Sequence, residues 1–202
     1  MLYYKEYTGH VGDIVGKRKK IDNTIYTFDI ETTSYYLLHN KVYAGITYKD
    51  LTQDEKDIII PQTCMYIWML GINDKVYYGR TWDEFVEFIE LIDKYVPEKK
   101  TIFVHNLAFE FQFLKSVFKI NNVFARRSHK VIRCELEDYN IELRCTLNMS
   151  NCALEYLPKL YGLPVEKKVG DLDYTKIRTS KTKLTEKEMG YCEYDCLVVY
   201  YY

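Results

Sequence analysis

Residues 25–31 read Ile-Tyr-Thr-Phe-Asp-Ile-Glu, and this stretch decides the fold that we expect for the chain. Its β-branched and aromatic residues predict a strand, and the Thr-Thr-Ser at residues 32–34 predicts a turn after it. Residues two apart on a strand point to the same face, so Asp29 and Glu31 project together from the strand's end. Two neighbouring carboxylates repel each other unless a cation lies between them, and Mg²⁺ and Mn²⁺ prefer such oxygen ligands. Many strands end in such a pair without binding a metal.

Strand and helix signals continue through the rest of the chain. A hairpin is expected from residues 65–72 and 75–78, which turn at Asn73-Asp74. Thr81 and Thr185 each stand three residues before a glutamate, which is the capping-box pattern of a helix start. The other expected elements are a strand over residues 101–105, a helix over 107–118, a strand hairpin over 131–137 and 139–145, a helix over 152–161 that ends at Gly162, and a polar connector over 166–183. Early antiparallel strands followed by alternating helices and strands predict an α/β fold, a mixed β-sheet flanked by helices.

The composition is that of a folded domain. The chain has 202 residues, of which 48% are hydrophobic and 28% charged. No apolar stretch approaches the roughly 20 residues that span a bilayer, and the N-terminus shows no signal-peptide pattern. Six cysteines without a Cys-x-x-Cys pair predict reduced thiols. These features predict a cytoplasmic protein with no membrane partner.

Charge is distributed unevenly, although the net charge is only −1. Basic residues gather at 17–20, at Arg126-Arg127 with His129-Lys130, and at Lys167-Lys168. Each cluster by itself is typical of a solvated surface loop. The overall charge therefore neither requires nor excludes a nucleic-acid partner.

Two further segments carry acidic residues beside aromatic ones. His105-Asn106 ends a predicted strand, and Glu110 then falls in the first turn of a helix. On a purely structural interpretation, Asn106 caps that helix while Phe109 and Phe113, four apart, pack in the core. Tyr191 and Asp195 are also four apart and share one face of the last helix, where a core tyrosine beside a surface aspartate is the structural alternative.

Together the three segments resemble, in order and spacing, the three motifs of proofreading exonucleases. These motifs are Asp-x-Glu on a strand, Asn-x-x-Phe followed by an acid at a strand–helix junction, and Tyr-x-x-x-Asp on a late helix. The set is similar to the tyrosine branch of the Asp-Glu-Asp-Asp exonuclease superfamily. The histidine branch would place histidine at position 190, where this chain has Gly190. The resemblance implies a ribonuclease H-like fold.

Residues 28–33, 104–107 and 170–176 narrow the resemblance to the N-terminal exonuclease domain of protein-primed family B DNA polymerases of phages and linear plasmids. Thr146-Leu147 falls where that family carries a Ser/Thr-Leu DNA-binding motif. The resemblance covers residues 25–202. It implies an N-terminal extension over residues 1–24, an exonuclease domain over 25–202, and polymerase motifs beyond Tyr202. The apolar end of the chain also predicts a fragment of a longer protein.

The chemistry that this family implies is proofreading, the hydrolysis of the 3′-terminal phosphodiester of single-stranded DNA with two divalent ions, Mg²⁺ or Mn²⁺. Asp29 would bridge the two ions. Glu31 and Asp195 would hold the ion that binds the attacking water, and Glu110 would hold the second ion, mostly through water. Tyr191 would orient the attacking water, since an unperturbed phenol with a pKa near 10 is a poor base.

The family also implies how the strand is held and which partners take part. Aromatic stacking accepts any base, which suits an enzyme that must remove any mispaired terminus. The residues implied to grip the single strand are Thr32, His105, Asn106, Phe109, Phe113, Thr146 and Leu147, together with Lys168. The implied partners are the 3′ end of single-stranded DNA, a polymerase domain C-terminal to this segment, and a terminal protein that serves as primer.

Two departures from the family pattern leave alternatives open. The second motif normally ends in aspartate, whereas this chain has Glu110, which carries the same charge on one more methylene. The family lysine precedes Gly170 directly, but Val169 stands there and Lys168 lies one residue earlier. In an extended segment that offset reverses the direction of the side chain. A nuclease-inactive nucleic-acid-binding or docking module and an RNA 3′ exonuclease are the alternative functions.

Overall fold

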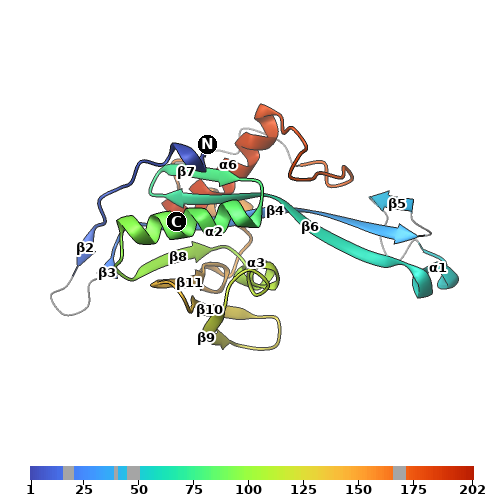
Figure 1. The fold of residues 1–202 in the computed structure, drawn as a ribbon, viewed down its shortest axis with the longest axis horizontal. Coiled ribbons are helices and arrows are strands. Elements are labelled where there is room, and N and C mark those ends of the chain that lie inside the picture. The colour runs from blue at the N-terminus through green and yellow to red at the C-terminus, as the bar shows by residue number, and fades with distance from the viewer. Residues whose placement is uncertain (16–20, 39–40, 45–50, 166–171) are drawn as a thin grey trace.

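A computed structural model describes residues 1–15, 21–38, 41–44, 51–165 and 172–202 (Figure 1). Within these residues, nine strands form one mixed sheet in the order β1-β7-β6-β4-β8-β11-β10-β9, with β5 paired to β4. The strands of this sheet are β1 (Leu2–Tyr3), β4 (Tyr26–Leu38), β5 (Lys41–Ala44), β6 (Ile60–Ile72), β7 (Lys75–Gly79), β8 (Lys100–Val104), β9 (Ile120–Ala125), β10 (Val131–Leu136) and β11 (Ile141–Cys145). A separate pair is formed by β2 (Ile14–Val15) and β3 (Ile21–Asp22). The predicted α/β class with a mixed sheet is confirmed.

Helices cover both faces of the sheet (Figure 1). They are α1 (Gln53–Ile58), α2 (Trp82–Tyr95), α3 (Leu107–Leu114), α4 (Leu147–Ser150), α5 (Leu157–Tyr161) and α6 (Glu186–Tyr201), with the 3-10 turns η1 (Tyr4–Glu6) and η3 (Leu154–Tyr156). The capping boxes predicted at Thr81 and Thr185 are both present, so the starts of α2 and α6 are as expected. One face of the sheet packs against α2, where Phe85 and Phe88 contact Trp68 of β6.

The two faces of β4 have opposite characters because side chains alternate along a strand. Phe28 and Ile30 enter the apolar core beneath α2. Asp29 and Glu31 therefore point to the other face, which α6 covers. Strands β4, β8 and β11 are parallel and in register, with Phe28 opposite Val104. The carboxyl ends of β8 and β11 consequently lie beside Phe28 of β4, at one edge of the sheet.

The prediction of a turn at residues 32–34 is wrong. β4 continues to Leu38 and pairs with β6 as far as Ile60, with a bulge between Glu31 and Thr32. Threonine is β-branched and suits an extended strand, and the bulge absorbs the change in register without breaking the ladder. The two strands run beyond the rest of the sheet as a long arm, to which β5 adds a third strand (Figure 1).

Two helices differ from their predicted ranges. The helix expected over residues 107–118 ends at Leu114, and tighter turns follow, in which Ser116 donates to the Phe113 carbonyl through both its main-chain N–H and its hydroxyl. The helix expected over 152–161 is a 3-10 turn followed by α5, which has Pro158 in its first turn. Proline has no N–H to donate and is tolerated only at a helix start. α5 ends at Gly162 as predicted, in the left-handed conformation (φ 63°).

Three further predictions were reduced thiols, the absence of a membrane-spanning segment and a polar connector over residues 166–183. All six cysteines are free, and four of them are buried. Among the described residues, no helix combines the length and the apolar character needed to cross a bilayer. The predicted basic residue Lys168 and part of the connector over residues 166–183 lie outside the described residues.

Candidate metal centre

Three carboxylates meet at the face of the sheet that α6 covers. Asp29 and Glu31 come from β4, and Asp195 comes from α6. Each offers an oxygen, and these oxygens all lie within 4.8 Å of one another. Strand alternation presents the first two side by side, and the packing of α6 on β4 brings the third against them.

The fourth predicted carboxylate, Glu110, approaches the same space from the first turn of α3. Glu110 is only 3% exposed, and its buried Oε2 atom has no hydrogen-bond partner among the described residues. A buried, unsatisfied carboxylate oxygen is costly unless a proton or a cation compensates it. The negative charge of Glu110 also contributes to the raised pKa of Asp29. Glu110 thus borders the three-carboxylate cluster, although it is not a member of the group that lies within 4.8 Å.

Burial and mutual repulsion shift these carboxyl groups far from their usual titration range. Burial first, and then the charges of Asp195, Glu31 and Glu110, raise the pKa of Asp29 well above its ordinary value. Burial and Asp195 raise the pKa of Glu31 to about 8, while the nearby Arg178 lowers it in part. Burial, followed by the Glu31 charge, raises the pKa of Glu110 to about 8. Groups of this kind favour either a shared proton or a bound cation.

The donor set fits divalent cations. The carboxylates of Asp29, Glu31 and Asp195 are close enough to share one, and the charge of Glu110 also acts on Asp29. Carboxylate oxygens are the hard ligands that Mg²⁺ and Mn²⁺ prefer. A cation would compensate both the repulsion among the carboxylates and the unsatisfied Glu110 oxygen.

Two tyrosine hydroxyls lie beside the cluster. The Tyr191 hydroxyl is 3.3 Å from that of Tyr174, which comes from the connector before α6. Burial, and then the Asp195 charge, raise the pKa of Tyr191 above its ordinary value. Tyr191 therefore keeps its proton at neutral pH and can donate a hydrogen bond beside the carboxylates.

A small pocket opens next to Glu31. It has a volume of about 280 Å³ and is lined by Glu31, Thr32, Phe109 and Tyr174, with Ile30 and Ser34. Phe109 is 41% exposed, so its ring faces outward rather than into the core. The sequence predicted Thr32 and Phe109 for strand binding, and the structure places both at this pocket beside the carboxylates.

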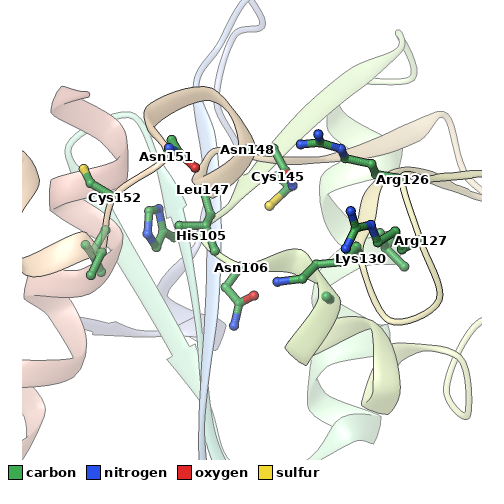
Figure 2. Close-up of a pocket in the computed structure, with 14 residues that line it drawn as sticks. His105, Asn106, Arg126, Arg127, Lys130, Cys145, Leu147, Asn148, Asn151 and Cys152 are labelled. Carbon is green, nitrogen blue, oxygen red and sulfur yellow. The ribbon is translucent and has the colours of Figure 1, made fainter.

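Four further residues that were predicted to bind the DNA strand lie farther along the same edge of the sheet. His105, Asn106 and Leu147 line a second pocket of about 640 Å³ (Figure 2). Thr146 is buried, and its hydroxyl lies 3.0 Å from Nδ1 of His105. Phe113 is half-buried against the core and contacts the ring of Phe109 at a centroid distance of 5.4 Å. Phe113 thus packs between the core and the ring of Phe109.

Asn106 occupies the first position before α3 in a left-handed conformation, with φ 68° and ψ 46°. Asn106 is therefore the N-cap residue, as the structural interpretation expected, but its side chain forms no capping hydrogen bond within the described part of the helix. Asparagine tolerates this backbone conformation better than most residues. Asn106 is exposed where β8 passes into α3, the helix that carries Phe109 and Glu110.

Arg178 joins the connector to both neighbouring elements. Its guanidinium is 4% exposed and donates to Glu188 of α6 at 2.6 Å and 2.9 Å, and to the carbonyl of Asp173 at 2.8 Å. Its main-chain N–H donates to the Thr33 hydroxyl of β4 at 3.0 Å. These bonds fix the segment that carries Tyr174 against the cluster. Neither Tyr174 nor Arg178 was predicted as a site residue. Tyr174 lies within residues 170–176, which carry the family resemblance, but no role was assigned to it, and nothing local distinguishes Arg178 from other polar connector residues.

Replacing Arg178 by alanine is expected to destabilise the protein by about 3 kcal/mol, the lower end for breaking a buried ion pair, because Glu188 keeps part of its exposure. For a chain of this size, that corresponds to a fall in Tm of about 10 °C. Thermal unfolding followed by circular dichroism measures it. Lys187→Ala removes an exposed cation from the same helix and should change the Tm by less than about 2 °C. Equal Tm values for the two variants would contradict the anchoring role.

Comparisons with known proteins identify the fold. No protein-family model matches the sequence, and no curated protein matches it significantly. Two solved structures of phi29 DNA polymerase, complexed with single-stranded DNA and with primer-template DNA and incoming nucleotide, match with TM-scores of 0.61 and 0.62 at 16% identity. A third, in an orthorhombic crystal form, matches with a TM-score of 0.59 at 18% identity.

The match to phi29 DNA polymerase covers 88% of this chain but only 29–30% of the polymerase chain. The chain therefore spans less than a third of the length of the structures it matches. It has the fold of the matching part of that polymerase, and the fold implied by the resemblance to family B DNA polymerases is confirmed.

Proposed function

We propose that this chain is a metal-dependent 3′→5′ exonuclease domain that removes nucleotides from the 3′ ends of single-stranded DNA. The observation that carries the proposal is the meeting of Asp29, Glu31 and Asp195 oxygens within 4.8 Å. They lie beside a pocket with an exposed aromatic ring, Phe109, and a tyrosine hydroxyl, Tyr174. Acidic oxygens next to a stacking surface suit the hydrolysis of a phosphodiester at the end of a strand.

In this proposal each residue has a distinct task. Asp29, Glu31, Asp195 and Glu110 would hold two divalent ions, Mg²⁺ or Mn²⁺. When bound, such ions supply an activated water and stabilise the charge on the departing 3′-oxygen. Tyr191 retains its proton and donates a hydrogen bond that orients the water. Attack of that water on phosphorus breaks the bond to the 3′-oxygen of the preceding nucleotide and releases a 5′-mononucleotide.

The terminal nucleotide would occupy the pocket beside Glu31. Phe109 offers the ring on which the terminal base stacks, a contact worth about 1–3 kcal/mol for any base. Thr32 and Tyr174 would supply polar contacts on the other walls of the pocket. His105, Asn106, Thr146 and Leu147 would hold the strand farther from its end. Stacking of this kind accepts any base, as a proofreading exonuclease requires.

The fold supports the same proposal. The solved structures with this fold are of a DNA polymerase, and one of them is a complex with single-stranded DNA. We therefore propose that residues 25–202 act as the exonuclease domain of a longer, phage-type DNA polymerase in the host cytoplasm. Its polymerase domain would follow C-terminally, and a terminal protein would serve as primer. Residues 1–24 would form an extension of this domain.

The direct test uses single-stranded DNA of about 15 nucleotides with a 5′ fluorophore, incubated with Mg²⁺, Mn²⁺ or EDTA. We expect shortening from the 3′ end in either metal and none in EDTA. An RNA of the same sequence is run in parallel. No shortening in either metal would favour a nuclease-inactive binding module, and faster shortening of the RNA would favour an RNA exonuclease.

A more specific prediction concerns Glu110. Its side chain has one methylene more than the aspartate of the family pattern, which alters how the carboxylate reaches a cation. Mn²⁺ tolerates a wider range of ligand geometry than Mg²⁺. We therefore expect Mn²⁺ to stimulate the wild type more strongly than it stimulates Glu110→Asp. The Mn²⁺/Mg²⁺ rate ratio on one single-stranded substrate measures the difference.

The control for this prediction is Glu155→Asp, an exposed glutamate outside the cluster, which should keep the wild-type ratio. The alternative role for Glu110 is a favourable charge at the start of α3, worth about 0.3–1 kcal/mol. On that alternative, Glu110→Asp would leave the Mn²⁺/Mg²⁺ rate ratio unchanged.

A further inference from the structure

A basic pocket lies at the same edge of the sheet as the carboxylate cluster. Arg126, Arg127 and Lys130, from the turn between β9 and β10, form one wall (Figure 2). Asn106 and His105 lie across from them, and the Lys130 side chain extends toward Asn106 (Figure 2). Among the described residues that line this pocket, none is aspartate or glutamate. The pocket is therefore a concentrated site of positive charge on a chain whose net charge is −1.

Within the described part of the chain, these three cations form no ion pair, in contrast to their neighbours. Arg144 and Arg133, on the adjoining strands, both contact Glu142. Unpaired cations held close together repel one another, and an anion bound between them relieves that repulsion. The cluster at Arg126, Arg127 and Lys130 is thus suited to an anionic ligand in a way that its paired neighbours are not.

The turn that carries the cations has a defined conformation. Val131 pairs with Ala125 in the hairpin. The N–H of Arg126 donates to the Lys130 carbonyl at 3.1 Å, and the N–H of Lys130 donates to the Arg127 carbonyl at 3.0 Å. His129 adopts the left-handed conformation, with φ 60°. The positive groups are therefore presented by a closed turn.

Sheet register places this turn in line with the carboxylates. Phe28, next to Asp29, is opposite Val104 of β8, and Val104 is opposite Cys145 of β11. β10 follows β11 in the sheet, and its first residue, Val131, directly follows the turn. β4, which carries Asp29 and Glu31, and β10, which follows the turn, are therefore three strand spacings apart, about 14 Å between their backbones. His105, Asn106 and Leu147 lie between them at the ends of β8 and β11.

We propose that this basic pocket binds the phosphodiester backbone of the single strand on the 5′ side of its terminal nucleotide. The inference rests on the proposed function only in placing the 3′ terminus at the carboxylates. An arginine guanidinium can donate two parallel hydrogen bonds to two oxygens of one phosphate, and a lysine ammonium adds a compact positive charge. Asn148 and Asn151 line the same pocket and offer amide donors. Such contacts position a strand without reading its sequence.

The test compares two variants that lose the same charge. Arg126→Gln/Arg127→Gln/Lys130→Gln removes the pocket's cations. Lys75→Gln/Lys94→Gln/Lys119→Gln removes three exposed lysines that do not line the pocket. Binding of a fluorescent trinucleotide and of a single strand of about 15 nucleotides is measured by anisotropy in EDTA, over a range of salt concentrations. Cleavage of the trinucleotide in Mg²⁺ is then measured for each protein.

For the pocket variant, we expect the Kd for the long strand to rise at least tenfold at low salt. The slope of log Kd against log salt should fall by about 2, because each lost phosphate contact contributes about 0.7 for single strands. Binding and cleavage of the trinucleotide should stay within twofold of wild type, since its two phosphates lie close to the 3′ terminus, beside the pocket at Glu31. The lysine control should bind both strands within twofold of wild type.

Three results would overturn the inference. An unchanged Kd for the long strand would show that the cations contact no phosphate. An equal loss in the lysine control would show only a general effect of charge. Equally good competition by polyglutamate of matched charge would assign the pocket to an acidic protein segment instead. If the wild type cleaves no strand but the pocket variant alone loses long-strand binding, the proposed function fails while the pocket inference stands.

Discussion

Replacing Asp29 by alanine is expected to lower metal-dependent cleavage at least about a thousandfold while the protein stays folded. Asp29 is one of the three clustered carboxylates, and the charges of Asp195, Glu31 and Glu110 all raise its pKa. Losing the ligand assigned to both cations should cost about 4 kcal/mol of transition-state stabilisation, and each 1.4 kcal/mol is a factor of ten. Initial rates on a labelled single strand in Mg²⁺ measure the loss.

The same substitution should leave the Tm in EDTA unchanged or higher, because it removes one of several carboxylates that repel each other. Asp138→Ala, at an exposed turn, is the matched control and should keep both rate and Tm. Cleavage by Asp29→Ala within tenfold of wild type would contradict the bridging assignment. A large fall in Tm would show instead that Asp29 is needed for folding.

In the absence of metal, the free energy of unfolding is expected to fall as the pH rises from about 5 to about 9. Carboxyl groups in the unfolded chain release their protons near pH 4. In the folded protein, the pKa values of Glu31 and Glu110 are raised to about 8, and that of Asp29 is also raised. The folded state therefore holds more protons across this window, so its stability is lost as the pH rises. Thermal unfolding in EDTA at several pH values measures the slope.

Divalent cations should reverse this trend, because they bind the deprotonated carboxylates. The difference in Tm with and without Mn²⁺ should grow with pH and reach at least about 5 °C at pH 9. Glu31→Gln provides the control, because it should flatten the slope in EDTA. Burial lowers the pKa of His10 and of His105, but these histidines are common to both proteins and their contributions cancel in the comparison. An equal slope in wild type and Glu31→Gln would contradict the prediction.

Local sequence patterns were sufficient for the elements that present the cluster. The alternation of apolar and acidic residues at 28–31 placed Asp29 and Glu31 on one face of a strand, and the spacing of Tyr191 and Asp195 placed both on one face of a helix. Both patterns span only a few residues, because side chains alternate along a strand and repeat about every 3.6 residues along a helix. The structure shows where the side chains lie, and their catalytic roles stay predictions until cleavage is measured.

Features that depend on contacts between distant residues were not predictable in this way. The extension of β4 past Glu31 needs a partner in β6, and the threonines and serine that follow read locally as a turn. Arg178 acts through Thr33 and Glu188, which lie 145 and 10 residues away in sequence. β9 contains Asn121 and Asn122, is exposed along most of its length, and shows no apolar alternation to mark it as a strand.

The distribution of thiols makes the protein suited to site-selective labelling without added cysteines. Four of the six are buried, and burial raises the pKa of Cys134, Cys192 and Cys196 above that of a free thiol, which slows their alkylation. Cys64 and Cys152 are partly exposed, and burial also raises the pKa of Cys64. Cys152 lines the basic pocket beside His105 (Figure 2). A dye attached to the native Cys152 would report the arrival of a strand at that pocket in real time, while the charged residues that bind the strand stay unaltered.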